Sequence, residues 1–167
     1  RCDGTVVLRA SGGLGGRDLD VDRAWRQAPE VPPPDECPPR ELTSETGHSF
    51  TDYADIRLAG QAPGEPVVYY WARLSRDAAS SSEGLIALAD LIPSGMRVSL
   101  DMAFKGSSLD HTVRIASVEQ SEWVLIRIEA DAIRNSVGQG RVEIYSQNGR
   151  LLATGSQSFA ISAITGP

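Results

Sequence analysis

The sequence has few cysteines, no long apolar run and no excess of positive charge, and each absence excludes a class of protein. Only two of its 167 residues are cysteine, too few for a disulfide framework. No apolar stretch approaches the roughly 18 residues that a membrane-spanning helix needs. The net charge of −6 argues against nucleic acid or an anionic membrane as the main partner. Since no signal peptide is visible either, these features predict a cytoplasmic protein without a membrane span.

No motif for a bound nucleotide or metal is present. The glycine-rich stretch of residues 12–16 follows a strand-like segment but leads into charged residues, not into a helix. It therefore fails as a phosphate-binding loop. The cysteines and histidines do not cluster at metal-ligand spacing. The sequence thus predicts neither a cofactor nor a metal.

The composition is that of a globular protein, with 41% hydrophobic and 23% charged residues. The length fits one domain and an extra segment. Residues 1–10 contain a strand-like stretch, and residues 11–49 are rich in glycine and proline, which predicts an extended linker. We therefore place the main domain at residues 50–167.

The main domain is predicted to consist of strands around a single helix. Residues 80–96 predict a largely buried helix, with Ser80 as its N-cap and Glu83 completing a capping box. Asn148 and Gly149 predict a type I′ hairpin. The expected strands are residues 50–58, 66–74, 97–104, 108–115, 122–130, 140–145 and 151–164. This order predicts an α+β fold in which an antiparallel sheet wraps around one long central helix.

Two polar residues are predicted on otherwise apolar faces. Asp90 lies in a narrow polar stripe of the helix, which is either its solvent face or the place of a carboxylate that acts as a base. Gln157 shares its strand parity with apolar residues, so it should point toward the core, where a carboxamide needs hydrogen-bond partners. Those partners are either a neighbouring backbone or a water or substrate carbonyl.

A serine, histidine and aspartate lie close together in the sequence, but they do not predict a nucleophilic triad. Asp110 and His111 are adjacent in an expected strand and therefore face opposite sides, and Ser107 and Ser108 are not in a Gly-x-Ser-x-Gly elbow. His48 lies in a polar loop, where we expect it to be solvated.

Four stretches carry a resemblance to a known family. They are YYWARL (69–74), LIALADLIPSG (85–95), SSLDHTVRI (107–115), and SEWVLIRIEA followed by GRVEIYSQNGRLLATGSQSF (121–130 and 140–159). Together they resemble the second hotdog domain of the double-hotdog acyl-CoA thioesterases, the TesB-like or acyl-CoA thioesterase II group. Leu-Asp-His after a hydroxyl residue is the most specific of these features. The resemblance implies a hotdog fold.

The resemblance also implies a catalytic site and an activity. In that family an aspartate of the hotdog helix, a threonine or serine before the Leu-Asp-His, and a glutamine near the C-terminus hold the catalytic water. Carried over by motif, these residues are Asp90, Ser108 and Gln157. Ser108 stands where threonine is better known, and Ser158 follows the glutamine where Glu or Gln is usual. The implied reaction is hydrolysis of fatty acyl-CoA by an activated water, with backbone N–H groups at a helix N-terminus stabilising the oxyanion.

Hotdog domains pair, so the resemblance implies a companion. Residues 1–10 are then expected to be the last strand of a preceding hotdog, residues 11–49 the linker between the two hotdogs, and residues 50–167 the C-terminal hotdog. The chain would be part of a longer protein, seated against a companion chain or segment that carries the first hotdog, in an oligomer of such units. The alternative function is a catalytically inactive hotdog module that binds an acyl group or a partner. A hotdog hydratase is disfavoured, because it needs a histidine on the helix.

Overall fold

The computed structural model describes residues 9–16, 21–40, 53–61, 65–74, 80–163 of the chain. The strand expected within residues 1–10 lies almost wholly outside this part. His48 and the first residues of the strand expected at residues 50–58 lie outside it too. Within the described part no helix is long and apolar enough to cross a membrane.

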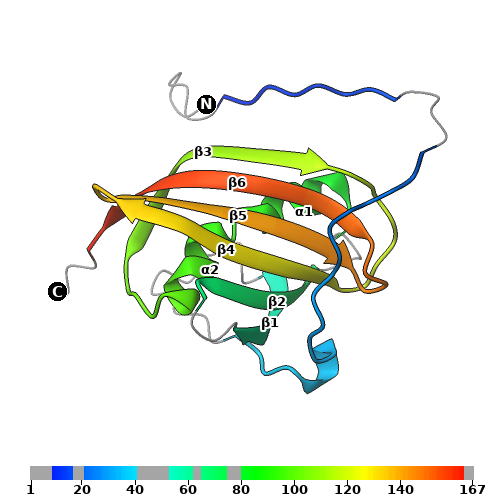
Figure 1. The fold of residues 1–167 in the computed structure, drawn as a ribbon, viewed down its shortest axis with the longest axis horizontal. Coiled ribbons are helices and arrows are strands. Elements are labelled where there is room, and N and C mark those ends of the chain that lie inside the picture. Colours follow the sequence, from blue (N-terminus) through cyan, green and yellow to red (C-terminus); the bar gives the residue numbers. More distant parts are fainter. Residues whose placement is uncertain (1–8, 17–20, 41–52, 62–64, 75–79, 164–167) are drawn as a thin grey trace.

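In the described residues six strands form one antiparallel sheet (Figure 1). The antiparallel sheet is as the sequence predicts, with one strand fewer than the seven expected. Their order across the sheet is β1-β2-β4-β5-β6-β3, so β3 and β1 are its two edges. The strands are β1 (Ala54–Gln61), β2 (Val67–Leu74), β3 (Lys105–Ile115), β4 (Val124–Arg134), β5 (Val137–Ser146) and β6 (Leu151–Ser162). β4, β5 and β6 follow one another through short turns, whereas β2 pairs with β4, and β3, which comes after the helical segment, pairs with β6 at the end of the described chain.

The inner face of the sheet curves around the helices α1 (Ser82–Ala89) and α2 (Ile92–Ser99) and forms the main core. The fully buried residues of this core come from all layers: Leu85, Leu88, Ile92, Met96, Tyr70, Ile126, Ile128, Ile144, Leu152 and Phe159. Burial of this apolar surface is the main force that holds helices and sheet together.

The single helix expected over residues 80–96 is wrong in one respect, since it is broken into two helices of eight residues each. Pro93 has no N–H to donate to the carbonyl of Ala89, and its ring crowds that turn, so the first helix ends before it. Near its start a proline is favourable, and α2 begins at Ile92. The N-cap is Ser81, not Ser80: the Ser81 hydroxyl accepts from the backbone N–H of Gly84 at 3.0 Å.

The strand expected at residues 97–104 is also wrong, because α2 continues through Ser99 and no strand follows until Lys105. Asp101 then takes a positive φ of 48°, which turns the chain toward β3. The other expected strands are present, with β1 shifted toward Gln61 and β4 and β5 extended toward each other.

The type I′ turn is at a different hairpin from the expected one. Type I′ needs a positive φ at both central residues. Asn135 and Ser136, between β4 and β5, have φ values of 50° and 61° and meet this requirement. Between β5 and β6, Gly149 has a positive φ of 83° and donates its N–H to the Ser146 carbonyl, while Asn148 is outside the positive-φ region. The Asn-Gly pair therefore makes a turn in which glycine alone takes the left-handed conformation.

Part of the outer face of the sheet is covered by the N-terminal segment of residues 21–40, which crosses from the β5–β6 turn to β1 (Figure 1). The indole N–H of Trp71 donates to the Pro32 carbonyl at 2.8 Å, and Pro39 forms an antiparallel bridge with Arg57. A short 3-10 helix, η1 (Pro34–Glu36), lies along this path. The segment covers an outer cluster of Cys37, Ala59, Trp71, Trp123, Leu125 and Tyr145. Burial raises the pKa of the Cys37 thiol, which packs there as a small apolar group.

Candidate active site

Gln157 connects the residues that the sequence singles out. It lies in β6 with only 2% of its surface exposed, on the inner face as its strand parity predicts. Its amide nitrogen Nε2 donates to Oδ1 of Asp90 at 2.5 Å and to Oγ of Ser108 at 2.9 Å. A carboxylate only accepts hydrogen bonds, so the NH₂ group must be the end of the amide that faces Asp90. The structure thus brings Asp90, Ser108 and Gln157 into one hydrogen-bonded trio.

Asp90 occupies the break between the two helices. It is the C-cap of α1, with φ −74° and ψ 3°. Its backbone N–H donates to the carbonyls of Ala87 and Leu88. Its side chain is exposed on the open side of the helical segment, which the sheet does not cover. The polar stripe therefore does face outward, and the same break that ends α1 sets the carboxylate toward β6.

Ser108 reaches the inner face because β3 carries a bulge. Ser108 pairs with Phe159 and Asp110 pairs with Ser158, so Leu109 is the extra residue in β3. A bulge changes the parity of a strand by one residue. Ser108 and His111 consequently lie on the same face as the inward-facing residues Phe159 and Gln157.

Ser108, Asp110 and His111, all within the described residues, do not form a Ser-His-Asp triad, as the sequence predicts. Oδ1 of Asp110 accepts the backbone N–H of Ser158 at 3.2 Å, on the exposed side of β6. His111 is the cross-strand neighbour of Gln157, and its buried Nε2 has no hydrogen-bond partner among the described residues. A histidine beside the glutamine could not be located from the sequence alone, because its side depends on the bulge at Leu109.

The trio leaves specific hydrogen-bonding capacity unused. Ser108 accepts from Gln157, so its hydroxyl proton can still be donated. Oδ2 of Asp90 makes no bond within the described part of the chain, and Oε1 of Gln157 is buried without a partner. An exposed carboxylate and hydroxyl, held by one buried amide, can bind and orient a water molecule.

The large apolar residues around the site lie in different parts of the fold. Trp71 lies in the outer cluster, and Met102 is 44% exposed. Met96 and Phe104 are buried in the main core. Among the described ranges no group of three or more His, Cys, Asp or Glu residues could hold a metal ion.

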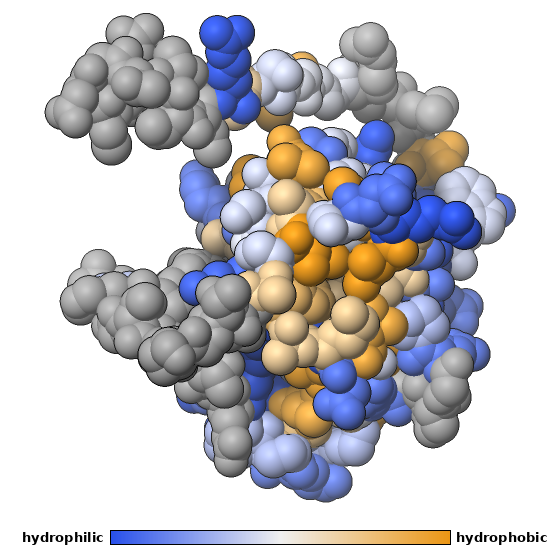
Figure 2. Space-filling view, turned by 90° about the vertical axis from the view of Figure 1, so that its left-hand side faces the viewer, coloured by the Kyte–Doolittle hydropathy of each residue, from blue (hydrophilic) through white to orange (hydrophobic). Residues whose placement is uncertain are grey.

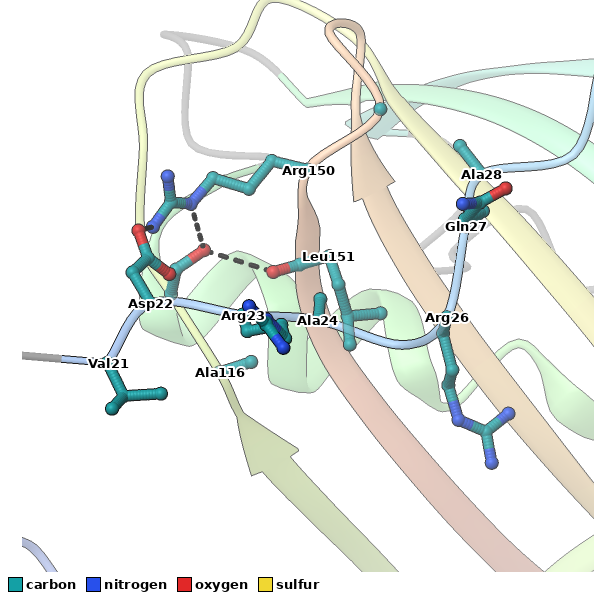
Figure 3. Close-up of a pocket in the computed structure, with 12 residues that line it drawn as sticks. Val21, Asp22, Arg23, Ala24, Arg26, Gln27, Ala28, Ala116, Arg150 and Leu151 are labelled. Carbon is teal, nitrogen blue, oxygen red and sulfur yellow. Dashed lines mark hydrogen bonds and ion pairs between the residues drawn. The ribbon is translucent and has the colours of Figure 1, made fainter.

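A pocket of about 670 Å³ lies away from the trio, beneath the N-terminal segment (Figure 3). Leu151, one of its lining residues, is six residues from Gln157 on β6, about 20 Å at the usual rise of a strand. Two of its arginines are already paired: Arg150 with Asp22 at 2.8 Å, and Arg26 with Glu143. We interpret this pocket as the space between the crossing segment and the β5–β6 turn.

The fold and the trio together are typical of one class of proteins, and similarity to known families identifies it. Residues 29–161 match the model of the family "Acyl-CoA thioesterase C-terminal domain". The match spans most of the chain, and the chain belongs to this family. No curated protein matches it.

Solved structures show the same hotdog fold. A putative thioesterase from Novosphingobium aromaticivorans is 30% identical, with a TM-score of 0.79 over 90% of this chain and 60% of its own. A hotdog-fold protein of unknown function from Alicyclobacillus acidocaldarius is 20% identical, with a TM-score of 0.75 over 89% of this chain and 60% of its own. A hypothetical thioesterase from Streptococcus pneumoniae, solved with coenzyme A, is 14% identical, with a TM-score of 0.55 over 65% of this chain and 87% of its own. The chain thus spans about 60% of the length of the first two.

Proposed function

We propose that the protein is an acyl-CoA thioesterase that hydrolyses fatty acyl-CoA to the free acid and CoA with an activated water. The observation that carries this proposal is the double hydrogen bond from Gln157 to Asp90 and Ser108. Family membership and the coenzyme A bound in the Streptococcus pneumoniae structure support the substrate class. We place the reaction in the cytoplasm.

In this mechanism Asp90 is the base. A water held between Asp90 and the Ser108 hydroxyl loses a proton to the carboxylate while its oxygen bonds to the thioester carbonyl carbon. Backbone N–H groups at a helix N-terminus stabilise the negative oxygen that forms. The C–S bond then breaks, and the proton passes from Asp90 to the leaving thiolate. Gln157 holds the two reacting side chains at a fixed separation, which keeps the water in position for attack.

The acyl group is assigned to the apolar surface beside α2. Figure 2 looks at the end of the molecule that lies at the left of Figure 1, and apolar side chains gather along the middle of this face. Residues of α2, β4 and β6 that are only partly buried against the main core are Val98, Ile133 and Ile161. Burial of acyl methylene groups there contributes about 0.8 kcal/mol each.

A companion hotdog is part of this proposal. β3 carries Ser108 and is an edge strand whose residues are mostly exposed. An edge of eleven residues offers a row of unpaired backbone groups to another strand. A second hotdog paired there would cover Asp90 and Ser108 and exclude bulk water from the thioester. We assign residues 1–10 to the companion's sheet and residues 11–49 to the connection.

Hydrolysis of acyl-CoA is the direct test. The purified protein is expected to release free CoA thiol from straight-chain acyl-CoA substrates, with a rate that depends on chain length because the acyl group is bound by apolar contact. Release is measured with a thiol reagent across short, medium and long chains. A background rate with every chain length would contradict the enzyme assignment, and tight acyl-CoA binding without turnover would instead support the inactive acyl-binding module.

Substitutions at Ser108 test the role of its hydroxyl. Ser108→Ala removes the group that accepts from Gln157 and donates to the water. kcat is expected to fall by about 10- to 100-fold, which corresponds to the roughly 1.5–3 kcal/mol of a hydrogen bond that involves a charged group. Ser108→Thr keeps the hydroxyl and is expected to retain activity. Both variants are measured with the preferred acyl-CoA. Equal activity of the alanine and threonine variants would show that the Ser108 hydroxyl has no role in catalysis.

A further inference from the structure

Two arginines and a tyrosine form a second polar cluster further along the helical segment from Asp90. Ser94 and Arg97 of α2 follow Asp90 at four and seven residues, which continues the outward polar stripe. Both residues belong to α2, on the far side of the helix break at Asp90. Arg40 and Tyr70 complete the cluster from the β1 side of the sheet.

Arg40 is held in place by both its backbone and its side chain. Its N–H donates to the Ile56 carbonyl at 2.8 Å, which ties the crossing segment to the β1 edge. Its guanidinium lies 5.3 Å from the centre of the Tyr70 ring, and its Nη2 donates to the hydroxyl of Ser94. The cation therefore bridges the sheet edge and α2.

Arg97 approaches the same place from the helix. Its guanidinium lies 5.3 Å from the centre of the Phe104 ring. Burial lowers the pKa of Arg97, and the positive charge of Arg40 lowers it further, so the two cations act on one another. Aromatic rings contact the flat faces of both guanidinium groups, and this leaves their N–H edges as the part that can bind a ligand.

Among the described residues the cluster contains more donors than acceptors. Nη1 of Arg40, Nε of Arg97 and the hydroxyl of Tyr70 are all buried, and none has a hydrogen-bond partner in this part of the chain. Tyr70 itself is 0% exposed. Neither arginine forms an ion pair with a carboxylate of the described residues, and Asp90, the acid on the same stripe, is bonded to Gln157. Buried cations and donors without acceptors are costly, and an anion with several oxygens is the ligand that satisfies them.

We propose that Arg40, Arg97, Ser94 and Tyr70 bind an anionic group of the substrate, a carboxylate or a phosphate. This inference rests on the proposed function. A planar guanidinium pair with a tyrosine hydroxyl can give at least three hydrogen bonds to such a group.

The position of the cluster favours a carboxylate on the acyl group. Asp90 marks where the thioester carbonyl must lie. Arg97 follows it by only seven residues in the helical segment, and Arg40 hydrogen-bonds Ser94, which lies between the two in sequence. The first phosphate of coenzyme A is separated from the sulfur by the whole pantetheine arm, which is too long for this spacing when extended. A carboxylate at the far end of a short acyl chain fits it. The substrate class is therefore an acyl-CoA whose acyl group ends in a carboxylate.

The test compares two substrates that differ only in that carboxylate. Adipoyl-CoA and hexanoyl-CoA both have six-carbon acyl groups, and the wild-type protein is expected to prefer adipoyl-CoA at least tenfold in kcat/KM. Arg97→Met and Tyr70→Phe are each expected to reduce this preference, mainly through KM for adipoyl-CoA. Arg134→Gln, which removes an exposed arginine at the end of β4, is the matched control. Thermal unfolding of each variant checks that it is folded, and calorimetric binding of both substrates to Asp90→Asn gives a readout independent of turnover.

The outcomes separate this inference from the proposed function. Loss of the adipoyl-CoA preference in the variants supports the carboxylate assignment. An equal rise in KM for both substrates supports the anion site but assigns it to a phosphate of coenzyme A. A third outcome is that Arg97→Met and Tyr70→Phe change the hydrolysis and binding of both substrates no more than the control Arg134→Gln does. This outcome would overturn the anion site and leave the thioesterase assignment intact. Binding selectivity without hydrolysis by the wild type would support the site while contradicting the proposed function.

Discussion

Asp90→Asn is expected to lower kcat/KM for acyl-CoA hydrolysis by about 10²- to 10⁴-fold, the usual contribution of a positioned general base. The substitution keeps the size of the side chain and an oxygen that can still accept from Gln157. It removes the negative charge that takes the proton from the attacking water. The loss should therefore appear in kcat, with KM nearly unchanged, when measured with the preferred acyl-CoA.

Glu83→Gln is the matched control for this experiment. Glu83 is the other carboxylate of the helical segment, two turns earlier on the same stripe, and it is exposed near the N-terminus of α1. Its neutralisation should leave kcat within about twofold, since it contacts none of the trio. If Asp90→Asn and Glu83→Gln had equal kcat values, Asp90 would not be the base, and its bond to Gln157 would be structural.

Phe159→Ala is expected to destabilise the folded protein by about 3–5 kcal/mol, the range for truncation of a buried aromatic residue. Phe159 is 0% exposed, and its ring stacks on Phe104 with centroids 5.9 Å apart. Gly106 and Gly138 flank the ring, and a Cβ at Gly138 would overlap it. The ring thus fills a space that neighbouring strands leave for it, and its loss creates a cavity. Urea unfolding, followed by circular dichroism, measures the change in the free energy of unfolding.

Two further variants show whether packing is the cause. Phe159→Leu retains part of the buried volume and should recover part of the lost stability. Gly138→Ala adds one methyl group against the ring and should cost about 1–3 kcal/mol by overpacking. Wild-type stability in either Phe159→Ala or Gly138→Ala would contradict this description of the packing around β6, the strand that also carries Gln157.

Local sequence pattern was sufficient for most of the fold. β-Branched and aromatic runs located β2, β4 and β6, and the apolar residues of 85–92 located the helical segment. The inward direction of Gln157 followed from strand parity alone, since successive side chains alternate between the two faces. These features depend on the residues of a single element, so the sequence contains the information that decides them.

Breaks within an element were harder to predict. The effect of Pro93 on the helix and the bulge at Leu109 both change which way a functional side chain points. The hydrophobic pattern continues through Pro93, so the pattern alone predicts one helix. The bulge is decided by how β3 pairs with β6, about 50 residues away, and no local signal in the Ser-Ser-Leu-Asp-His stretch reveals it.

The sequence alone determined the chemistry that is available: a carboxylate on the helix, a hydroxyl beside Leu-Asp-His and an amide in the last strand. The tertiary structure alone decided that these groups meet, because Gln157 bonds both Asp90 and Ser108 only once β6 pairs with β3 and both strands pack against α1. It also decided that Arg40, 54 residues before Ser94, reaches the same helix. Contacts between distant segments depend on packing and strand register, which no local pattern encodes.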